Sequence, residues 1–287
     1  MTDLSLAIVT ASTNIERARP CIESWVLHAE RSPLIFLIIN GGVSTLSPEA
    51  LVGSHVWHEV PEYLGSVPAF RRGVDLALES GGVDILACLH DDVEILEDGW
   101  DTKVRRAFER NPAMGLAGFG GATGLGDLDL YEKPYDPMSL ARTGFRSNLE
   151  DAEVHGLRSL LAERVAALDS FSLIGRREFW EGQLAPAPFT HVAQAASANL
   201  RPWTVLEDLG VVHHCHDGAI SCLAARYGWE TWFLPVRAKH WGGRTAVGDA
   251  GYQAWAKSKD PRGDQGFWYI AHEMCYEAFR DQLPLRV

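Results

Sequence analysis

The sequence predicts an α/β fold in which a doubly wound, mostly parallel mixed sheet is flanked by helices. Two observations support this prediction. Strand-like apolar runs alternate with helical spacings through the first 110 residues, a pattern typical of parallel strands that are joined by helices. One run, residues 83–89, is almost continuously apolar, as expected of a strand that is covered on both faces.

The elements of this first part follow one another as strand, helix, strand, strand, helix, strand and helix. We place them at residues 4–10, 15–30, 33–40, 55–60, 67–79, 83–89 and 100–110. Glycine pairs end the second strand and the second helix. Asn111-Pro112 ends the last helix, because the residue before a proline disfavours the helical conformation.

The middle of the chain has a less regular pattern. Residues 115–127 are rich in glycine but match neither a dinucleotide-binding nor a P-loop spacing, so we expect a mobile loop. A helix is expected over 151–167, and residues 167–182 have the pattern of a strand that leads into a short helix. Farther on, residues 211–228 predict a loop and a helix, and residues 230–236 predict a strand.

The C-terminal part predicts a further helix over residues 267–279. Its apolar positions recur on one helical face, which indicates either core packing or a contact in a homodimer. The positions are Phe267, Ile270, Ala271, Met274 and Ala278.

Composition narrows the class of protein. The chain has 287 residues, with 38 acidic and 26 basic side chains and a net charge of −12, which disfavours broad electrostatic binding to nucleic acid. Its five cysteines are scattered, and their odd number favours a reducing compartment. The sequence opens without a signal-peptide pattern, and no apolar segment approaches the ~20 residues that span a bilayer. We therefore expect a soluble, cytoplasmic protein.

A group of polar side chains ends the apolar run at residues 83–89. His90, Asp91, Asp92 and Glu94 follow it directly. Carboxylates this close repel one another, so either a positive group lies among them or they point into water. Because ligands bind beyond the carboxyl ends of strands in doubly wound sheets, the placement favours a binding site over a solvated turn.

Four segments carry a more specific pattern. They are LAIVTASTN (6–14), LIIN (37–40), LGSVPAFRRGVDLALESGGVDILACLHDDVEI (64–95) and HDGAISCLAARYGWETWFLPVRAKHWGGRT (216–245). In content and order they resemble the nucleotide-sugar glycosyltransferases of the GT-A fold, most closely glycosyltransferase family 2. The resemblance covers residues 4–245, with a poor match over 120–165.

The resemblance implies a GT-A-like glycosyltransferase domain over residues 1–245. Residues 1–115 would form its nucleotide-sugar-binding half and residues 116–245 its acceptor-side half. Residues 246–287 are then expected to form a C-terminal helical extension, and residues 120–145 a lid over the donor.

Roles for single residues also follow from the resemblance. The donor nucleotide would be held by residues from several segments. Asn40 stands where the family has an aspartate that contacts the base. Arg71 or Arg72 would reach the diphosphate, and Asp91 would lie near the ribose or a metal-bound water. The expected donor-binding residues are Thr10, Ala11, Asn14, Asn40, Arg71 and Asp91.

The same resemblance places Mn²⁺ or Mg²⁺ on Asp92, the last acid of the family's DXD motif, and on His240. His90 stands where the family has the first acid of that motif. Asp217 falls at the position of the general base, although an aspartate there also suits a helix cap. His240 also suits an ordinary surface position.

The implied activity is the inverting transfer of a sugar from a nucleotide sugar, UDP-linked above all, to an acceptor hydroxyl. The acceptor would be a glycan, a small molecule or, as in phage-type relatives, a hydroxymethylated DNA base. Two alternatives of other classes are a nucleotide-sugar-binding protein without catalysis and a zinc hydrolase built on His213–Asp217.

Two further features allow more than one interpretation. Residues 147–158 form either an exposed helix start or an insert that recognises the acceptor. Four tryptophans either pack in the core or stack on a sugar ring, namely Trp180, Trp203, Trp229 and Trp241.

Overall fold

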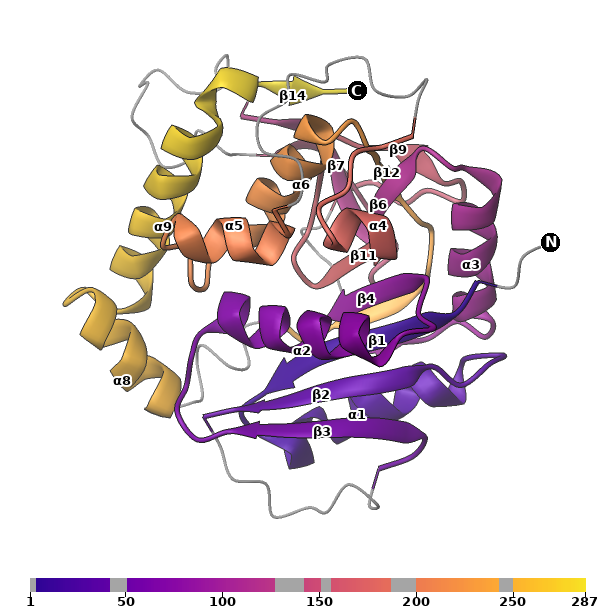
Figure 1. Cartoon of the computed structure of the whole chain (residues 1–287), viewed down its shortest axis with the longest axis horizontal. Coiled ribbons are helices and arrows are strands. Elements are labelled where there is room, and N and C mark those ends of the chain that lie inside the picture. The colour runs from indigo at the N-terminus through magenta and orange to yellow at the C-terminus, as the bar shows by residue number, and fades with distance from the viewer. Residues whose placement is uncertain (1–3, 42–50, 127–141, 151–155, 187–199, 243–249) are drawn as a thin grey trace.

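The computed structural model of the chain describes residues 4–41, 51–126, 142–150, 156–186, 200–242 and 250–287 (Figure 1). Its centre is a large sheet of strands β1 (Leu6–Ser12), β2 (Leu34–Asn40), β3 (Ser54–Val60), β4 (Ile85–Leu89), β6 (Met114–Gly118), β9 (Glu163–Arg164), β11 (Ser172–Arg176) and β12 (Glu230–Phe233). The strand order is β3-β2-β1-β4-β11-β6-β12-β9.

The sheet is mixed, and its first four strands in this order are parallel. Strand β11 lies antiparallel between β4 and β6, whereas β12 is again parallel to β6. The predicted α/β class with a mostly parallel mixed sheet is therefore confirmed. Because β11 runs in the opposite direction, it begins at the edge of the sheet where β4 ends.

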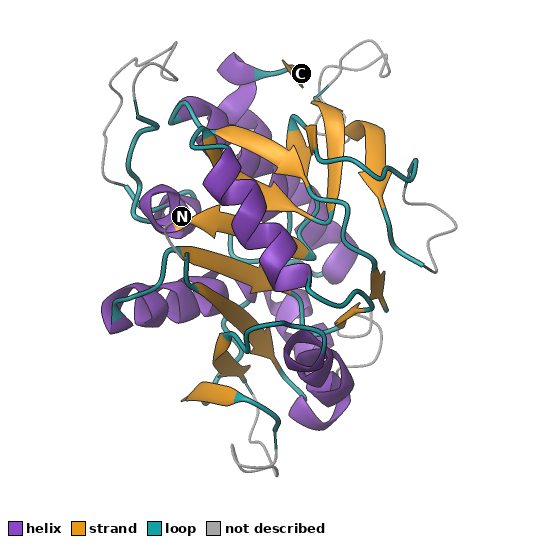
Figure 2. Cartoon of the chain, turned by 90° about the vertical axis from the view of Figure 1, so that its right-hand side faces the viewer, coloured by secondary structure: helices purple, strands orange, loops and turns teal. Residues whose placement is uncertain are grey.

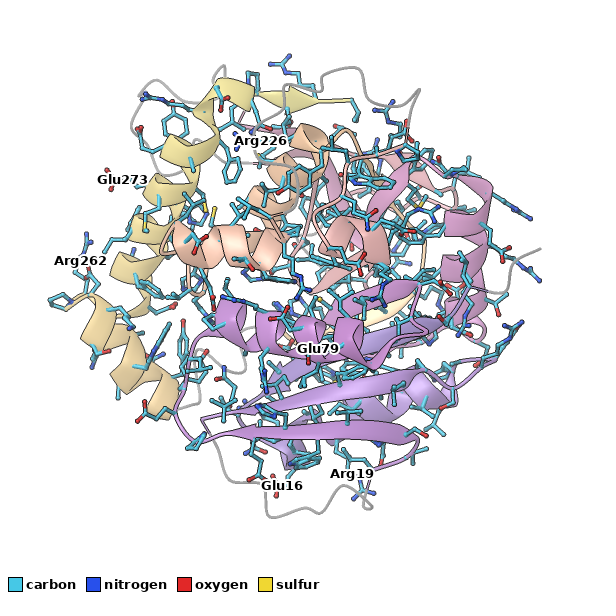
Figure 3. All side chains as sticks on the ribbon, in the orientation of Figure 1. Glu16, Arg19, Glu79, Arg226, Arg262 and Glu273 are labelled. Carbon is cyan, nitrogen blue, oxygen red and sulfur yellow. The ribbon has the colours of Figure 1, made fainter. Side chains whose placement is uncertain are left out.

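Helices cover both faces of the sheet, as Figure 2 shows from the side. Alternate residues of β1 face opposite ways: Ala7 and Val9 pack against α2 (Ser66–Ser80), and Leu6 and Ile8 lie in the core of the other face. That second face is covered by α1 (Ile15–Leu27) and α3 (Trp100–Arg110). Charged side chains gather on the outside, as the labelled residues of Figure 3 illustrate.

Two smaller sheets lie beside the large one. Strands β7 (Gly120–Leu125), β8 (Arg142–Ser147), β10 (Ala167–Leu168) and β14 (Leu285–Arg286) form an antiparallel sheet in which β7 pairs with the other three. A separate ladder joins β5 (Val93–Ile95) to β13 (Ala238–His240).

Two predictions for the middle of the chain are wrong. Most of the glycine-rich segment forms β6 and β7 instead of a loop, because its glycines allow neighbouring groups to approach closely. At Gly120, an added Cβ would lie 2.7 Å from the Phe171 ring. The expected helix over 151–167 is also absent from its described part, residues 156–167, where short strands occur instead. Of the expected lid over residues 120–145, residues 120–125 belong to β7 and residues 142–145 to β8, and residues 127–141 lie outside the described part of the chain.

The remaining helices of the described residues are α4 (Arg177–Trp180), α5 (Pro202–Asp208), α6 (His216–Arg226), α8 (Ala250–Lys259) and α9 (Asp264–Phe279), with a 3₁₀ turn, η4 (Arg280–Gln282), after α9. Phe267 and Ala271 of the apolar stripe on α9 are buried within the chain. Ile270, Met274 and Ala278 are only half-buried, so a homodimer through this helix stays a prediction. No helix of the described residues has the length and apolar character needed to cross a membrane.

Candidate active site

The candidate site lies where β1, β2 and β4 end and β11 begins. Parallel strands present their carboxyl ends at one edge, so Ser12, Asn40 and His90 all lie at this edge. The turn before β11 adds Ser170 and Phe171 from the opposite chain direction. The site is therefore built from both halves of the sequence.

A tight turn follows β4, and the short strand β5 after it pairs with β13, which carries His240. Val93 N donates a hydrogen bond to His90 O at 3.2 Å, and β5 then pairs with β13 so that Val93 lies opposite His240. Trp241 N extends the contact by donating to Asp92 O at 3.0 Å. These bonds place His240 beside residues that precede it by about 150 positions in the chain.

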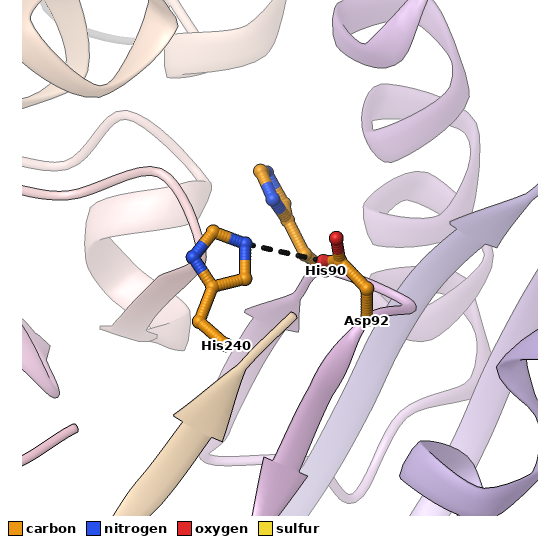
Figure 4. A group of neighbouring side chains, drawn as sticks. All are labelled: His90, Asp92 and His240. Atoms are coloured by element: carbon orange, nitrogen blue, oxygen red, sulfur yellow. Dashed lines mark ion pairs between the residues drawn. The ribbon is translucent and has the colours of Figure 1, made fainter. Parts of the chain in front are cut away.

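Three side chains meet at this point, as Figure 4 shows: His90, Asp92 and His240. His240 Nε2 lies 3.2 Å from Asp92 Oδ1, and one potential ligand atom from each residue lies within 4.8 Å of the others. Within the described part of the chain, no other three His, Cys, Asp or Glu side chains meet in this way. We call these three residues the ligand group.

Burial and the charges of neighbouring side chains shift the pKa values of the three residues of the ligand group. Burial lowers the pKa of His90 to about 4, so its imidazole is neutral at neutral pH and offers a lone pair. Burial also acts to raise the pKa of Asp92, but the His240 hydrogen bond and the nearby imidazoles outweigh it and lower that pKa. The same pairing raises the pKa of His240 against the effect of burial.

This donor set fits a divalent cation. It offers a carboxylate oxygen and two imidazole nitrogens, which suits Mn²⁺ better than Mg²⁺, since Mg²⁺ prefers oxygen ligands. The structure thus brings together the predicted ligands Asp92 and His240. Sequence reasoning missed His90 as a partner, although its spacing of two from Asp92 was a usable signal.

Asp91 is not part of the ligand group. Its Oδ2 accepts a hydrogen bond of 2.5 Å from Ser12 Oγ, and burial raises its pKa to about 6. Ser12 was not predicted to take part in the site. The bond fixes Asp91 against the end of β1, where the donor nucleoside was predicted to bind.

The three predicted nucleoside contacts of the first segment lie at or beyond the end of β1. Thr10 is fully buried, and the described residues provide no hydrogen-bond partner for its Oγ1. Ala11 is half-buried in β1. Asn14 caps α1, because its Oδ1 accepts from Arg17 N at 2.9 Å.

Asn40 and Arg71 make contacts within the chain. The Asn40 amide accepts from Leu64 N at 2.9 Å and donates to Gly65 O at 3.1 Å, which fixes the chain before α2. Arg71 bonds to Glu207 on α5, and its Nε lies 3.6 Å from Asp75 Oδ2. Their roles toward base and diphosphate stay predictions.

Asp217 lies in the first turn of α6 and is buried. Its Oδ2 accepts from Ser170 N at 3.1 Å and its Oδ1 from Gly218 N at 2.7 Å. Ser170 belongs to the turn that contacts the ligand group, so Asp217 is oriented by the same part of the chain. Its role as a base stays a prediction.

The three histidines at the start of α6 and directly before it have different hydrogen-bond partners. His213 Nδ1 accepts from Ser66 N at 3.1 Å, His216 Nδ1 lies 2.5 Å from His213 O, and His214 Nε2 pairs with Asp264 at 2.7 Å. They form no metal-ligand group with Cys215 or Asp217. The arrangement does not support a zinc hydrolase.

Of the four tryptophans considered, three are in the core and only Trp241 is exposed, at 39%. Its Nε1 donates to Glu94 Oε2 at 3.2 Å, and Lys239 Nζ lies 3.7 Å from the ring centroid. Residues 147–150 and 156–158 of the 147–158 segment lie in the described part of the chain. There the Asn148 amide donates to Ser159 O at 2.7 Å and accepts from Ser159 N at 3.1 Å.

The chain has a GT-A-like fold, as comparison with solved structures indicates. Among solved structures, the chain is similar to GalNAc-T7 with UDP, GalNAc and Mn²⁺, with 13% identity, a TM-score of 0.50 and coverage of 96% of this chain and 55% of that chain. It thus spans about half the length of that protein.

A second similar structure is A197 from STIV. It has 14% identity and a TM-score of 0.43, and covers 83% of this chain and 86% of its own. No protein-family model and no curated protein matches the sequence.

Proposed function

We propose that the protein is a metal-dependent glycosyltransferase that moves a sugar from a UDP-linked donor to an acceptor hydroxyl with inversion. The observation that carries this proposal is the ligand group at the carboxyl edge of β4 in a GT-A-like fold. The similar fold of GalNAc-T7, a structure with UDP and Mn²⁺, supports it.

The ligand group would hold the cation through Asp92 Oδ1, His90 and His240. Bound there, a divalent cation neutralises the negative charge of the diphosphate leaving group. Asp91 and the end of β1 would bind the nucleoside, with the buried Thr10 Oγ1 providing an additional polar atom.

Asp217 is the general base in this proposal. It takes the proton of the acceptor hydroxyl as that oxygen forms a bond to the anomeric carbon. The bond from the anomeric carbon to the diphosphate breaks on the opposite side, and its electron pair leaves with the diphosphate oxygen. The two backbone hydrogen bonds to Asp217 would keep its carboxylate oriented for this step.

The acceptor in this proposal is a glycan or a small hydroxylated molecule. Trp241 supports a carbohydrate, since it presents an exposed, oriented ring directly beside the His240 ligand. The net charge of −12 disfavours duplex DNA.

Calorimetric titration of UDP and GDP, with and without Mn²⁺, tests the proposal. We expect UDP to bind wild type in a Mn²⁺-dependent manner, and we expect Asp92→Ala to lose this binding. Asp98→Asn is the matched control, because its side chain is 92% exposed and its charge change is the same. Absence of nucleotide binding to the folded wild type under both conditions would refute the proposal.

Chemistry is tested separately with Asp217→Asn. We expect this variant to bind UDP and Mn²⁺ as wild type does, and to form product about 10²–10⁴-fold more slowly because it lacks the base. A variant that retains full activity would exclude Asp217 as the base.

A further inference from the structure

The turn between β10 and β11, residues 169–171, contacts the candidate site at consecutive positions. Phe171 O accepts a hydrogen bond from His90 N at 3.1 Å, and the Phe171 ring stacks on His240 with centroids 5.1 Å apart. The preceding residue is Ser170, and its backbone N donates a hydrogen bond to Asp217 Oδ2. The turn thus joins the ligand group to the proposed base.

Asp169 is the remaining residue of this turn, and its backbone is fixed on both sides. Its N donates to Gly120 O at 3.0 Å, and its carbonyl oxygen accepts from Ser172 N at 3.3 Å. The side chain is half-buried, so it is neither in the core nor freely exposed to water. The backbone at Asp169 is therefore held by β7 and β11.

The turn places Asp169 near the ligand group, since Phe171, two residues farther along the same turn, contacts both His90 and His240. Burial lowers the pKa of His90, and the negative charges of Asp92 and Asp169 act against that effect. At His240, where burial also acts to lower the pKa, Asp169 adds to the raising effect of Asp92. Asp169 nevertheless stands outside the ligand group that the described residues form.

A carboxylate in this place suits a sugar. When a diphosphate is held at the ligand group, the sugar attached to it must lie between that group and the proposed base. Asp169 and Asp217 are linked through adjacent residues of one turn, so Asp169 borders this space. A carboxylate has about four acceptor sites, and sugar hydroxyls are donors that match them.

We propose that Asp169 binds the transferred sugar by accepting hydrogen bonds from its hydroxyl groups, and that it thereby helps to select the donor. This inference rests on the proposed function. It assigns Asp169 a role in specificity that is separate from metal binding and from proton transfer.

The test compares binding of the nucleotide alone with binding of nucleotide sugars. Calorimetry with Mn²⁺ measures UDP, UDP-glucose, UDP-galactose, UDP-N-acetylglucosamine and UDP-N-acetylgalactosamine on wild type, Asp169→Asn and Asp169→Glu. Asp98→Asn again controls for loss of a negative charge, and circular dichroism verifies the fold. The readout is the ratio of the Kd of UDP to that of each UDP-sugar.

We expect Asp169→Asn to leave the Kd of UDP unchanged and to reduce the ratio for the preferred sugar about tenfold or more, the loss expected for a charged hydrogen-bond partner. Asp169→Glu, which moves the carboxylate by one methylene, should change the order of preference among the sugars.

Three results would overturn the inference. If wild type binds UDP and the ratios in Asp169→Asn equal those of wild type, the sugar role is wrong while the proposed function stands. If Asp169→Asn is folded but loses UDP itself, Asp169 acts on the metal or nucleotide instead. If folded wild type binds no nucleotide, the proposed function and this inference both fail.

Discussion

His90 occupies the first position after β4, where a carboxylate would add a third negative charge next to Asp91 and Asp92. An imidazole adds a ligand atom without adding charge, and burial keeps it neutral by lowering its pKa to about 4. The ligand group thereby has two nitrogens for one carboxylate, which favours Mn²⁺ over Mg²⁺.

Replacing this residue by His90→Ala should weaken Mn²⁺ binding in the presence of UDP by about tenfold or more, since even residues that only support metal ligands contribute about 10–100-fold. Electron paramagnetic resonance of free Mn²⁺ measures the affinity. His28→Ala at the end of α1 is the control, because His28 pairs with the exposed Asp98 outside the ligand group. Equal affinities in wild type and His90→Ala would remove His90 from the ligand set.

The candidate site was only partly predictable at the level of residues. Asp92 and His240 followed from a resemblance in motif order, and the structure brings them to 3.2 Å. Asn40 and Arg71 were chosen in the same way, yet their polar atoms bind the chain itself, a choice of partner that depends on Leu64, Gly65 and Glu207 in three dimensions.

At the scale of elements, glycines decide how closely the layers pack. Gly73 lies in the middle of α2, where an added Cβ would overlap Val9 Cγ1 of β1 and lie 3.3 Å from Ile38 Cγ1. Helix propensity alone would favour alanine by about 1 kcal/mol at such a position. The buried strand beneath leaves no room for it.

Gly73→Ala is therefore expected to lower the free energy of unfolding by about 1 kcal/mol or more, because overpacking outweighs the gain in propensity. Urea denaturation followed by circular dichroism measures the change. Glu79→Ala on the same helix is the control, since Glu79 is exposed (Figure 3). A more stable Gly73→Ala variant would show that α2 can move away from the sheet without cost.

Glycine content also explains which helices and strands could be predicted from the sequence. The strands and helices predicted in the first 110 residues lie within a few residues of their observed bounds, because periodic apolar spacing indicates burial, whereas the short strand β5 was not predicted. Strands β6 and β7 were missed, since glycines there replace the side chains that make a strand recognisable. Gly118 illustrates this, as an added Cβ would lie 2.5 Å from Ser172 O.

At the scale of the whole molecule, histidines that burial keeps neutral make the free energy of unfolding depend on pH. Burial lowers the pKa of His213 well below 6.5, and the charges of His214, His216 and His90 act in the same direction. Its neutral Nδ1 accepts from Ser66 N at the start of α2. The unfolded chain binds a proton on this residue more readily than the folded protein does.

The contribution of the neutral histidine to the free energy of unfolding should therefore be fully present above pH 6.5. It should decrease as the pH drops from 6.5 toward 5, by up to about 1.4 kcal/mol per pH unit for each such histidine. Urea denaturation at pH 5, 6 and 7 measures this. His213→Gln should be less stable at pH 7 but have a shallower dependence on pH. Equal slopes for the two proteins would contradict this assignment.

Strand β4 lies between β1 and β11, and all five of its residues are buried. Its amide hydrogens are therefore shielded by paired neighbours on both sides, a situation in which exchange with solvent requires opening of most of the fold. His90 and Asp92 are attached directly to this strand, so fraying of the surface loops leaves their anchor in place. The end of β4 that carries the ligand group can therefore keep its position when peripheral segments of the protein open.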